Sequence, residues 1–264
     1  MDHVDLTTTQ LLGAWRAMCA GAPGYQHRSA DGLAYVFSGL PIAFFNVAIV
    51  TARRVTAEAL ADAGRRATTW AAAQQVPWMF IVTHDTLEDG VDATRTLDGA
   101  GLAPMMPLTG MLATEVSPPG SLPGGLQVEI PQDDDRCAEV LNVNALAYGM
   151  DLEAGQSLMG KRSFWASHVP VVGSVDGKVV CCTAVMMVDG YRYVALVATD
   201  PAHQRRGYAD AVMRHALQIA NDVHGPHPTM LHATEAGRPV YERMGYEAIA
   251  RHTVFLEKRF LEGH

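Results

Sequence analysis

The sequence predicts an α/β protein of two halves, the second of which forms one mixed β-sheet with helices. Asp176–Gly177 and Asp189–Gly190 each separate two apolar runs, and Asp-Gly in that position is the strongest short signal for a β-hairpin. Residues 208–223 carry apolar side chains at helical spacing. Residues 117–125 (SPPGSLPGG) cannot sustain a helix or a central strand, so they indicate a linker between the halves.

The remaining elements follow from local patterns. Residues 57–75 are rich in helix formers, and Thr56 stands at the N-cap position before them. Asp133–Asp135 places negative charge where it favours the start of a helix. We expect strands at residues 33–38, 42–50, 78–83, 108–116, 126–130, 169–175, 178–188, 191–199, 228–234 and 253–257. We expect helices at residues 57–75, 92–100, 133–148, 152–162, 208–223 and 239–244.

The composition indicates a folded protein with a sizeable core, because 48% of the 264 residues are hydrophobic and 18% are charged. The formal net charge is −8 and no basic stripe appears, so neither nucleic acid nor an anionic membrane surface is an expected partner. No apolar stretch is long enough to span a bilayer, and Asp2 and Asp5 stand where a secretory signal needs positive charge. The four cysteines form no Cys-x-x-Cys pair, which favours buried, reduced thiols and a cytoplasmic location.

The most informative segment is LVATDPAHQRRGYA, residues 196–209, which joins an expected strand to an expected helix. Gly207 removes a side chain where a ligand would approach the backbone. The unpaired N–H groups of a first helical turn bind phosphate well, and Arg205 and Arg206 add cationic donors. Taken alone, Gln-x-x-Gly-x-Ala is also compatible with an ordinary turn before a helix.

In its context this segment resembles a known motif. Gln204–Ala209 is similar to the Arg/Gln-x-x-Gly-x-Gly/Ala motif of the GNAT superfamily of acyl-CoA N-acyltransferases, and it lies between a strand and a helix as it does there. Downstream, Val240–Tyr246 resembles the family's Leu-Tyr-x-x-x-Gly-Phe segment. The resemblance covers about residues 126–257 and implies a GNAT fold for the second half.

The resemblance also implies a function: transfer of an acyl group, acetyl by default, from acyl-CoA to a small-molecule or peptide amine. Tyr241 matches the family's frequent general acid, and a neutral phenol with a pKa near 10 can protonate the departing thiolate. Packing of the Tyr241 ring on the sheet is the alternative. No metal is implied. The pantetheine arm would pair with the backbone of Val197, Ala198 and Thr199, and the pyrophosphate would lie against Gln204, Arg205, Arg206, Gly207, Tyr208 and Ala209.

One expected group is missing. Family members often carry an acid on the central strand that accepts a proton from the amine, and residues 191–199 contain none. His203 and Glu235 are conceivable bases, and neither is assigned. A non-catalytic acyl-CoA-binding or sensing module is therefore the alternative function. The acceptor's identity stays open, as does the choice between monomer and homodimer.

The first half repeats the order of elements found late in the second. Residues 97–102 (LDGAGL) correspond to residues 241–246 (YERMGY), with Leu97 in place of the tyrosine, and residues 50–61 contain no Gly-x-Ala. We therefore expect residues 1–116 to form a degenerate GNAT-like domain without a cofactor site. Residues 117–125 would be a linker and residues 126–264 the acyl-CoA-binding GNAT domain. An unrelated α/β domain is the alternative for the first half.

Overall fold

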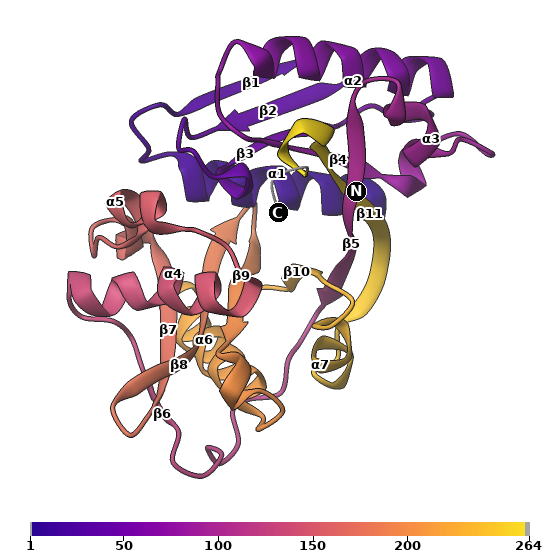
Figure 1. Ribbon diagram of the computed structural model, residues 1–264. Helices are drawn as coiled ribbons and strands as arrows, with labels where there is room; N and C mark the ends of the chain where they lie inside the picture. The colour runs from indigo at the N-terminus through magenta and orange to yellow at the C-terminus, as the bar shows by residue number, and fades with distance from the viewer. Residues whose placement is uncertain (1, 262–264) are drawn as a thin grey trace. The chain divides into compact units, whose positions relative to one another are not determined.

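The computed structural model describes residues 2–261, which form two compact units (Figure 1). Unit 1 takes in residues 2–111, 232–236 and 248–261, and unit 2 takes in residues 112–231 and 237–247. Both units are therefore built from segments that lie far apart in the sequence. Each unit is a mixed α/β layer structure, as the sequence predicts.

Unit 1 contains a mixed sheet with α1 (His3–Cys19) on one face and α2 (Ala57–Ala72) on the other (Figure 1). Within this unit the strand order is β1-β2-β3-β4-β11-β5. Only β3 and β4 run parallel among the strand pairs whose register is resolved in this unit. The strands are β1 (Gln26–Ala30), β2 (Leu33–Phe37), β3 (Asn46–Val50), β4 (Met79–Thr83), β5 (Leu102–Ala113) and β11 (Glu247–Glu257), and α3 (Ala93–Asp98) precedes β5.

The core of unit 1 forms because α2 presents one apolar stripe to the sheet. Leu60, Ala63, Ala67 and Ala71 recur at intervals of three or four residues and are buried. They pack in one cluster with the fully buried rings of the strands, which are those of Phe37, Trp78, Phe80 and Phe255.

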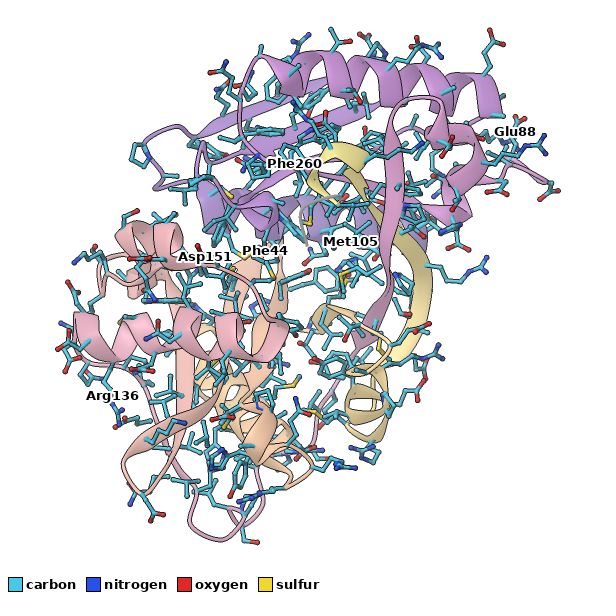
Figure 2. The ribbon with its side chains drawn as sticks, in the orientation of Figure 1. Phe44, Glu88, Met105, Arg136, Asp151 and Phe260 are labelled. Carbon is cyan, nitrogen blue, oxygen red and sulfur yellow. The ribbon has the colours of Figure 1, made fainter. Side chains whose placement is uncertain are left out.

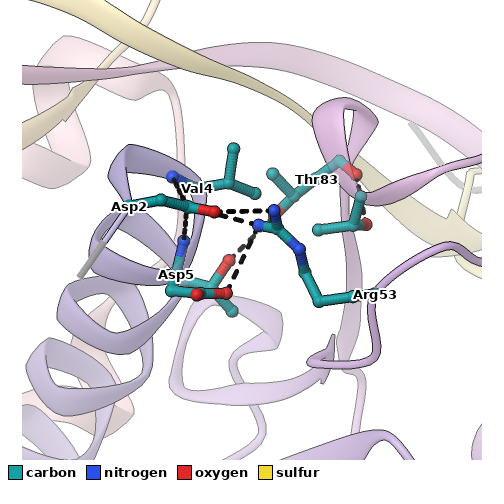
Figure 3. A network of polar contacts seen from close by, with 7 residues as sticks. Asp2, Val4, Asp5, Arg53 and Thr83 are labelled. Atoms are coloured by element: carbon teal, nitrogen blue, oxygen red, sulfur yellow. Dashed lines mark hydrogen bonds and ion pairs between the residues drawn. The ribbon is translucent and has the colours of Figure 1, made fainter.

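The start of α1 is fixed by polar contacts (Figure 3). The Asp2 side chain accepts hydrogen bonds from the backbone N–H groups of Val4 and Asp5, as an N-cap residue does. Arg53 forms ion pairs with Asp2 at 2.7 Å and with Asp5 at 3.3 Å. All three side chains are about half exposed, so the pairs contribute less to stability than the cap. Further along α1, the Trp15 indole donates to the Phe44 carbonyl at 2.7 Å (Figure 2 labels Phe44).

Unit 2 has the strand order β10-β9-β8-β7-β6, with α4 (Asp134–Tyr148) and α6 (Tyr208–His224) on opposite faces (Figure 1). Arg136 of α4, which is labelled in Figure 2, forms an ion pair with Glu129 at 2.7 Å. The strands of unit 2 are β6 (Gln127–Glu129), β7 (His168–Val175), β8 (Lys178–Val188), β9 (Tyr191–Thr199) and β10 (Thr229–Ala233). The short helices are α5 (Gln156–Met159) and α7 (Arg238–Arg243).

The hairpin prediction is confirmed in detail. Asp176 and Gly177 have φ of 50° and 81°, and Asp189 and Gly190 have φ of 44° and 80°. Two successive positive φ values define the turn type that Asp-Gly favours between antiparallel strands. The cysteine prediction also holds, since all four are buried free thiols.

Several elements differ from the expectation. α1 and β1 are not among the expected elements, and β5 begins six residues earlier than the expected strand at residue 108. The irregular helix expected at residues 152–162 is reduced to α5 and short 3₁₀ turns. The last strand, β11, which the expected division assigned to the second half, pairs antiparallel with β4 in unit 1. No helix among residues 2–261 is long and apolar enough to cross a membrane.

Candidate functional site

The strands β9 and β10 are paired over only two positions, Arg192 with Thr229 and Tyr193 with Met230. Beyond Tyr193, no further residues of β9 and β10 are paired in the described part of the chain. On the other side of β9, the register with β8 shifts between Cys182 and Ala184. Leu196 lies at this β-bulge with φ of 56°, a value that a leucine rarely adopts. The bulge bends β9. The last residues of β9 therefore form a strand edge that has no backbone pairing with β10.

Side chains from the α4 face hold this bulge in place. The Leu196 carbonyl accepts from the Asn144 side-chain amide at 3.3 Å and from the Cys182 thiol at 3.4 Å. The Tyr148 hydroxyl donates to the Val197 carbonyl at 3.0 Å. A carbonyl oxygen has two lone pairs, so Val197 can accept a second donor from a ligand. Sequence reasoning missed the role of Asn144, whose only signal is a polar residue on the buried side of a helix.

Tyr241 of α7 is buried, 8% exposed, and its ring centroid lies 6.2 Å from that of Tyr246. Burial raises the pKa of Tyr241, and the nearby hydroxyls of Tyr148, Tyr246 and Tyr193 act in the same direction. The phenol is therefore neutral throughout the physiological range. The Tyr246 hydroxyl bonds to Thr229 at 2.9 Å, whereas that of Tyr241 makes no hydrogen bond to another of residues 2–261. Tyr241 thus keeps its proton available for a ligand.

The turn that follows β9 is built around Asp200, which is 5% exposed. Its carboxylate accepts from the Ala202 backbone N–H at 2.9 Å and from the Lys178 ammonium at 3.0 Å. These two interactions hold the pKa of Asp200 below its usual value. His203 adds a contact at 3.4 Å. The turn is therefore a fixed platform for the residues that follow it.

The next residues have a backbone suited to an anion. Arg205 and Gly207 both have positive φ, 60° and 80°, and Gly207 is the residue directly before α6. A Cβ at position 207 would meet only the Pro123 side chain, at 3.6 Å, so the backbone conformation and not crowding is what requires glycine there. Glycine at the N-cap has no side chain that could accept a hydrogen bond, so the first N–H groups of α6 have no side-chain partner at that position. Residues 204–207 are exposed, which leaves this helix start open to phosphate oxygens.

The other candidates from the sequence have structural partners or lie elsewhere. His203 contacts Asp200, and Glu235 is an exposed residue of unit 1. In residues 2–261 no cluster of three or more His, Cys, Asp or Glu side chains could hold a metal ion.

The corresponding point of unit 1 lacks these features. β3 and β4 pair over three positions, from Val47–Met79 to Ile49–Ile81. None of the residues of β3 has a positive φ, and in the loop that follows Arg54 has one, 52°. The helix that follows, α2, is capped by the Thr56 side chain, which accepts from the Ala59 N–H at 3.1 Å. The opening, the bulge and the uncapped helix start therefore occur together in unit 2 and not at this point of unit 1.

The comparisons with known proteins agree with this geometry. Residues 163–248 match the family model described as an acetyltransferase (GNAT) domain. A search of the curated proteins finds no match to this chain. Among solved structures, a GCN5-related N-acetyltransferase from Kribbella flavida has a TM-score of 0.70 at 19% identity, over 97% of this chain and 96% of its own.

Two further structures show the same fold. A functionally unknown conserved protein from Staphylococcus epidermidis has a TM-score of 0.65 at 14% identity, over 90% of this chain and 96% of its own. A tandem GNAT protein from the clavulanic acid biosynthesis pathway has a TM-score of 0.52 at 14% identity, over 96% of this chain and 94% of its own. Residues 163–248 therefore match a GNAT acetyltransferase domain, and the chain has the fold of GCN5-related N-acetyltransferases, tandem GNAT proteins included.

Proposed function

We propose that this chain is an enzyme that transfers a short acyl group, acetyl by default, from acyl-CoA to an amine. The observation that carries the proposal is the separation of β9 from β10 beyond Tyr193, with the Leu196 bulge beside it. An extended pantetheine arm can bond to a strand edge that has no ladder, as added strands do. In this proposal the backbone of Val197, Ala198 and Thr199 supplies those bonds.

The loop before α6 would hold the pyrophosphate of the coenzyme. Arg205 and Gly207 have positive φ, a backbone conformation that occurs in anion-binding nests. The exposed guanidinium groups of Arg205 and Arg206 add charge-assisted donors, and the helix dipole adds a favourable field. Gln204, Tyr208 and Ala209 complete the segment that we assign to the coenzyme.

We assign Tyr241 as the general acid that protonates the departing thiolate. A thiol in water has a pKa of about 8.5, which is lower than that of a buried phenol. Burial raises thiol pKa values as well: the buried thiols of Cys19 and Cys181 in this chain have pKa values raised to about 12. A thiolate released into the same desolvated space is therefore a stronger base than in water, so burial raises the pKa of the proton acceptor together with that of Tyr241.

The acceptor that we propose is an amine of low pKa, such as an α-amine, an aryl amine or an aminosugar amine. β9 carries no carboxylate to remove the proton of an ammonium group. At pH 7 an α-amine of pKa about 8 needs roughly 1.4 kcal/mol to lose its proton, and a lysine-type amine of pKa about 10.4 needs about 4.6 kcal/mol. An enzyme without a placed base therefore favours the α-amine. The same missing base supports the second candidate function, an acyl-CoA-binding module without catalysis.

Release of free thiol from acetyl-CoA, measured with a panel of α-amines, aryl amines, aminosugars and ε-amines across pH, tests the proposal. Turnover that depends on the amine supports an acyltransferase, and a preference for α-amines at neutral pH supports the acceptor class. Tight acetyl-CoA binding without release of thiol for any amine would support the binding module instead. A preference for ε-amines would contradict the acceptor assignment.

The buried free thiols of the four cysteines support the expected cytoplasmic location.

A further inference from the structure

A pocket lies in unit 2, on the α6 face of the sheet. Its volume is about 460 Å³, within the range of small-molecule sites, and it is lined by the start of β9, by α6 and by residues 114–118. Arg192 and Tyr193 are neighbours in β9, so their side chains lie on opposite faces of the sheet. Tyr193 is the neighbour of Tyr241, and the pocket is therefore separate from the acyl-transfer site.

The buried side chain that lines this pocket is a cation. Arg192 is 7% exposed, and one guanidinium N–H group donates to the Leu217 carbonyl at 3.2 Å. Its Nε is buried and has no hydrogen-bond partner among residues 2–261. No carboxylate in that part of the chain forms an ion pair with Arg192. Burial lowers the pKa of Arg192 below its usual value, in keeping with a charge held away from water.

The neighbouring charges do not compensate for Arg192. Arg214, the second arginine of the pocket, is neutralised by Asp210 through contacts of 2.8 and 3.1 Å. Glu115 also lines the pocket, and it is exposed to solvent. A buried unpaired charge is costly, and replacing it by an apolar side chain is often neutral or stabilising. An arginine kept in such a place indicates a negatively charged partner that is not part of the chain.

We infer that the pocket beside Arg192 binds a small organic anion, a carboxylate or a phosphate ester, whose negative group pairs with the Arg192 guanidinium. The planar guanidinium presents N–H groups in a fork that matches both kinds of oxyanion. Leu217, Pro118 and Pro228 supply apolar surface for the rest of the ligand. The chain has a net charge of −8, so general attraction of anions to the protein does not account for binding here. This inference does not depend on the proposed acyl transfer.

Thermal unfolding of the full chain, titrated with succinate and separately with inorganic phosphate at constant ionic strength, tests the inference. Binding to the folded state raises the melting temperature with concentration and gives an apparent Kd. The two probes distinguish a carboxylate site from a phosphate site. We expect Arg192→Met to weaken the Kd of the better probe at least tenfold, because a charge-assisted hydrogen bond is lost. Glu115→Gln should strengthen binding, since it removes the acidic group at the pocket.

Two controls locate the effect. Arg28→Met makes the same change at an exposed position of β1 and should leave the Kd unchanged. Arg206→Met alters the coenzyme loop. If phosphate no longer raises the melting temperature of Arg206→Met but still raises that of Arg192→Met, the anion binds at the coenzyme loop and the inference is overturned. The absence of any stabilisation of the wild type by both probes, or an equal response in all variants, would also overturn it. If Arg192→Met does not fold, Arg192→Gln provides the same comparison.

Discussion

Mild acid should destabilise unit 1 through His252 of β11. This imidazole is 1% exposed, and its ring nitrogens lie 3.2 Å from the Thr7 hydroxyl and 3.0 Å from the Thr83 hydroxyl. Burial lowers the pKa of His252 from 6.5 to about 4. The neutral ring can satisfy both hydroxyl contacts, whereas the imidazolium has no carboxylate in hydrogen-bonding contact among residues 2–261.

The size of the effect follows from the two pKa values. Because the folded state has the lower pKa, the unfolded chain binds the proton more readily between pH 6.5 and about 4. The contribution to stability is therefore complete above pH 6.5 and is lost as the pH falls toward 4. Full protonation corresponds to about 3 kcal/mol, and about 2 kcal/mol of this is lost by pH 5.

Urea unfolding at pH 7.5 and pH 5, followed by tryptophan fluorescence, measures this loss, because Trp15, Trp70 and Trp78 lie in unit 1. His252→Gln is the matched variant, because glutamine keeps polar groups in the site and does not titrate. The wild type should lose about 2 kcal/mol more than the variant between the two pH values. The other histidines are present in both proteins, and His232, whose ring centroid lies 4.8 Å from that of His252, loses this ring contact in the variant. An equal loss in the wild type and in His252→Gln would refute the reasoning.

The other predictions concern unit 2. Gly207→Val should abolish coenzyme A binding without unfolding the chain. Calorimetry on the wild type should give one coenzyme A site per chain. Two sites, or an unchanged affinity in Gly207→Val, would contradict the assignment. Tyr241→Phe should lower kcat by roughly 10²–10⁴ with little effect on coenzyme binding. Tyr246→Phe, the matched control from the same cluster, should leave kcat within a few-fold, and equal losses in the two variants would assign Tyr241 to packing. Gly173→Ala should destabilise the chain by about 1–3 kcal/mol in urea unfolding, because the new Cβ would meet the Cys181 sulfur at 2.5 Å; an unchanged midpoint would mean that β7 and β8 separate without cost.

The elements that the sequence predicted well are those whose limits are set by local chemistry. β8 and β9 have the predicted bounds, because Asp-Gly turns fix both ends of β8 and the start of β9. α6 begins at Tyr208 as predicted, since Gly207 is the residue that can take the required positive φ. The GNAT motif was recognisable for the same reason, because a short backbone conformation determines its residues.

The features that the sequence did not predict depend on distant partners. The bulge at Leu196 is held by Asn144 and Cys182, and nothing in the residues of β9 itself requires it. α1 was missed because its buried side includes the polar residues Thr7 and Gln10, which interrupt the apolar period. The periodicity of β11 identifies a strand and contains no information on which strand it pairs with.

The pairing of β11 with β4 constrains the order in which the chain can fold during synthesis. Unit 1 includes residues 248–257, so a ribosome that has released only the first half presents β4 with one edge uncovered. Phe80, Ile81 and Val82 of that strand are fully buried in the folded unit. All three are apolar residues with high β-propensity, and an uncovered strand edge of such residues is prone to aggregation. The N-terminal half therefore cannot complete its sheet during synthesis until β11 has been translated, and before that its β4 edge must be protected or only loosely folded.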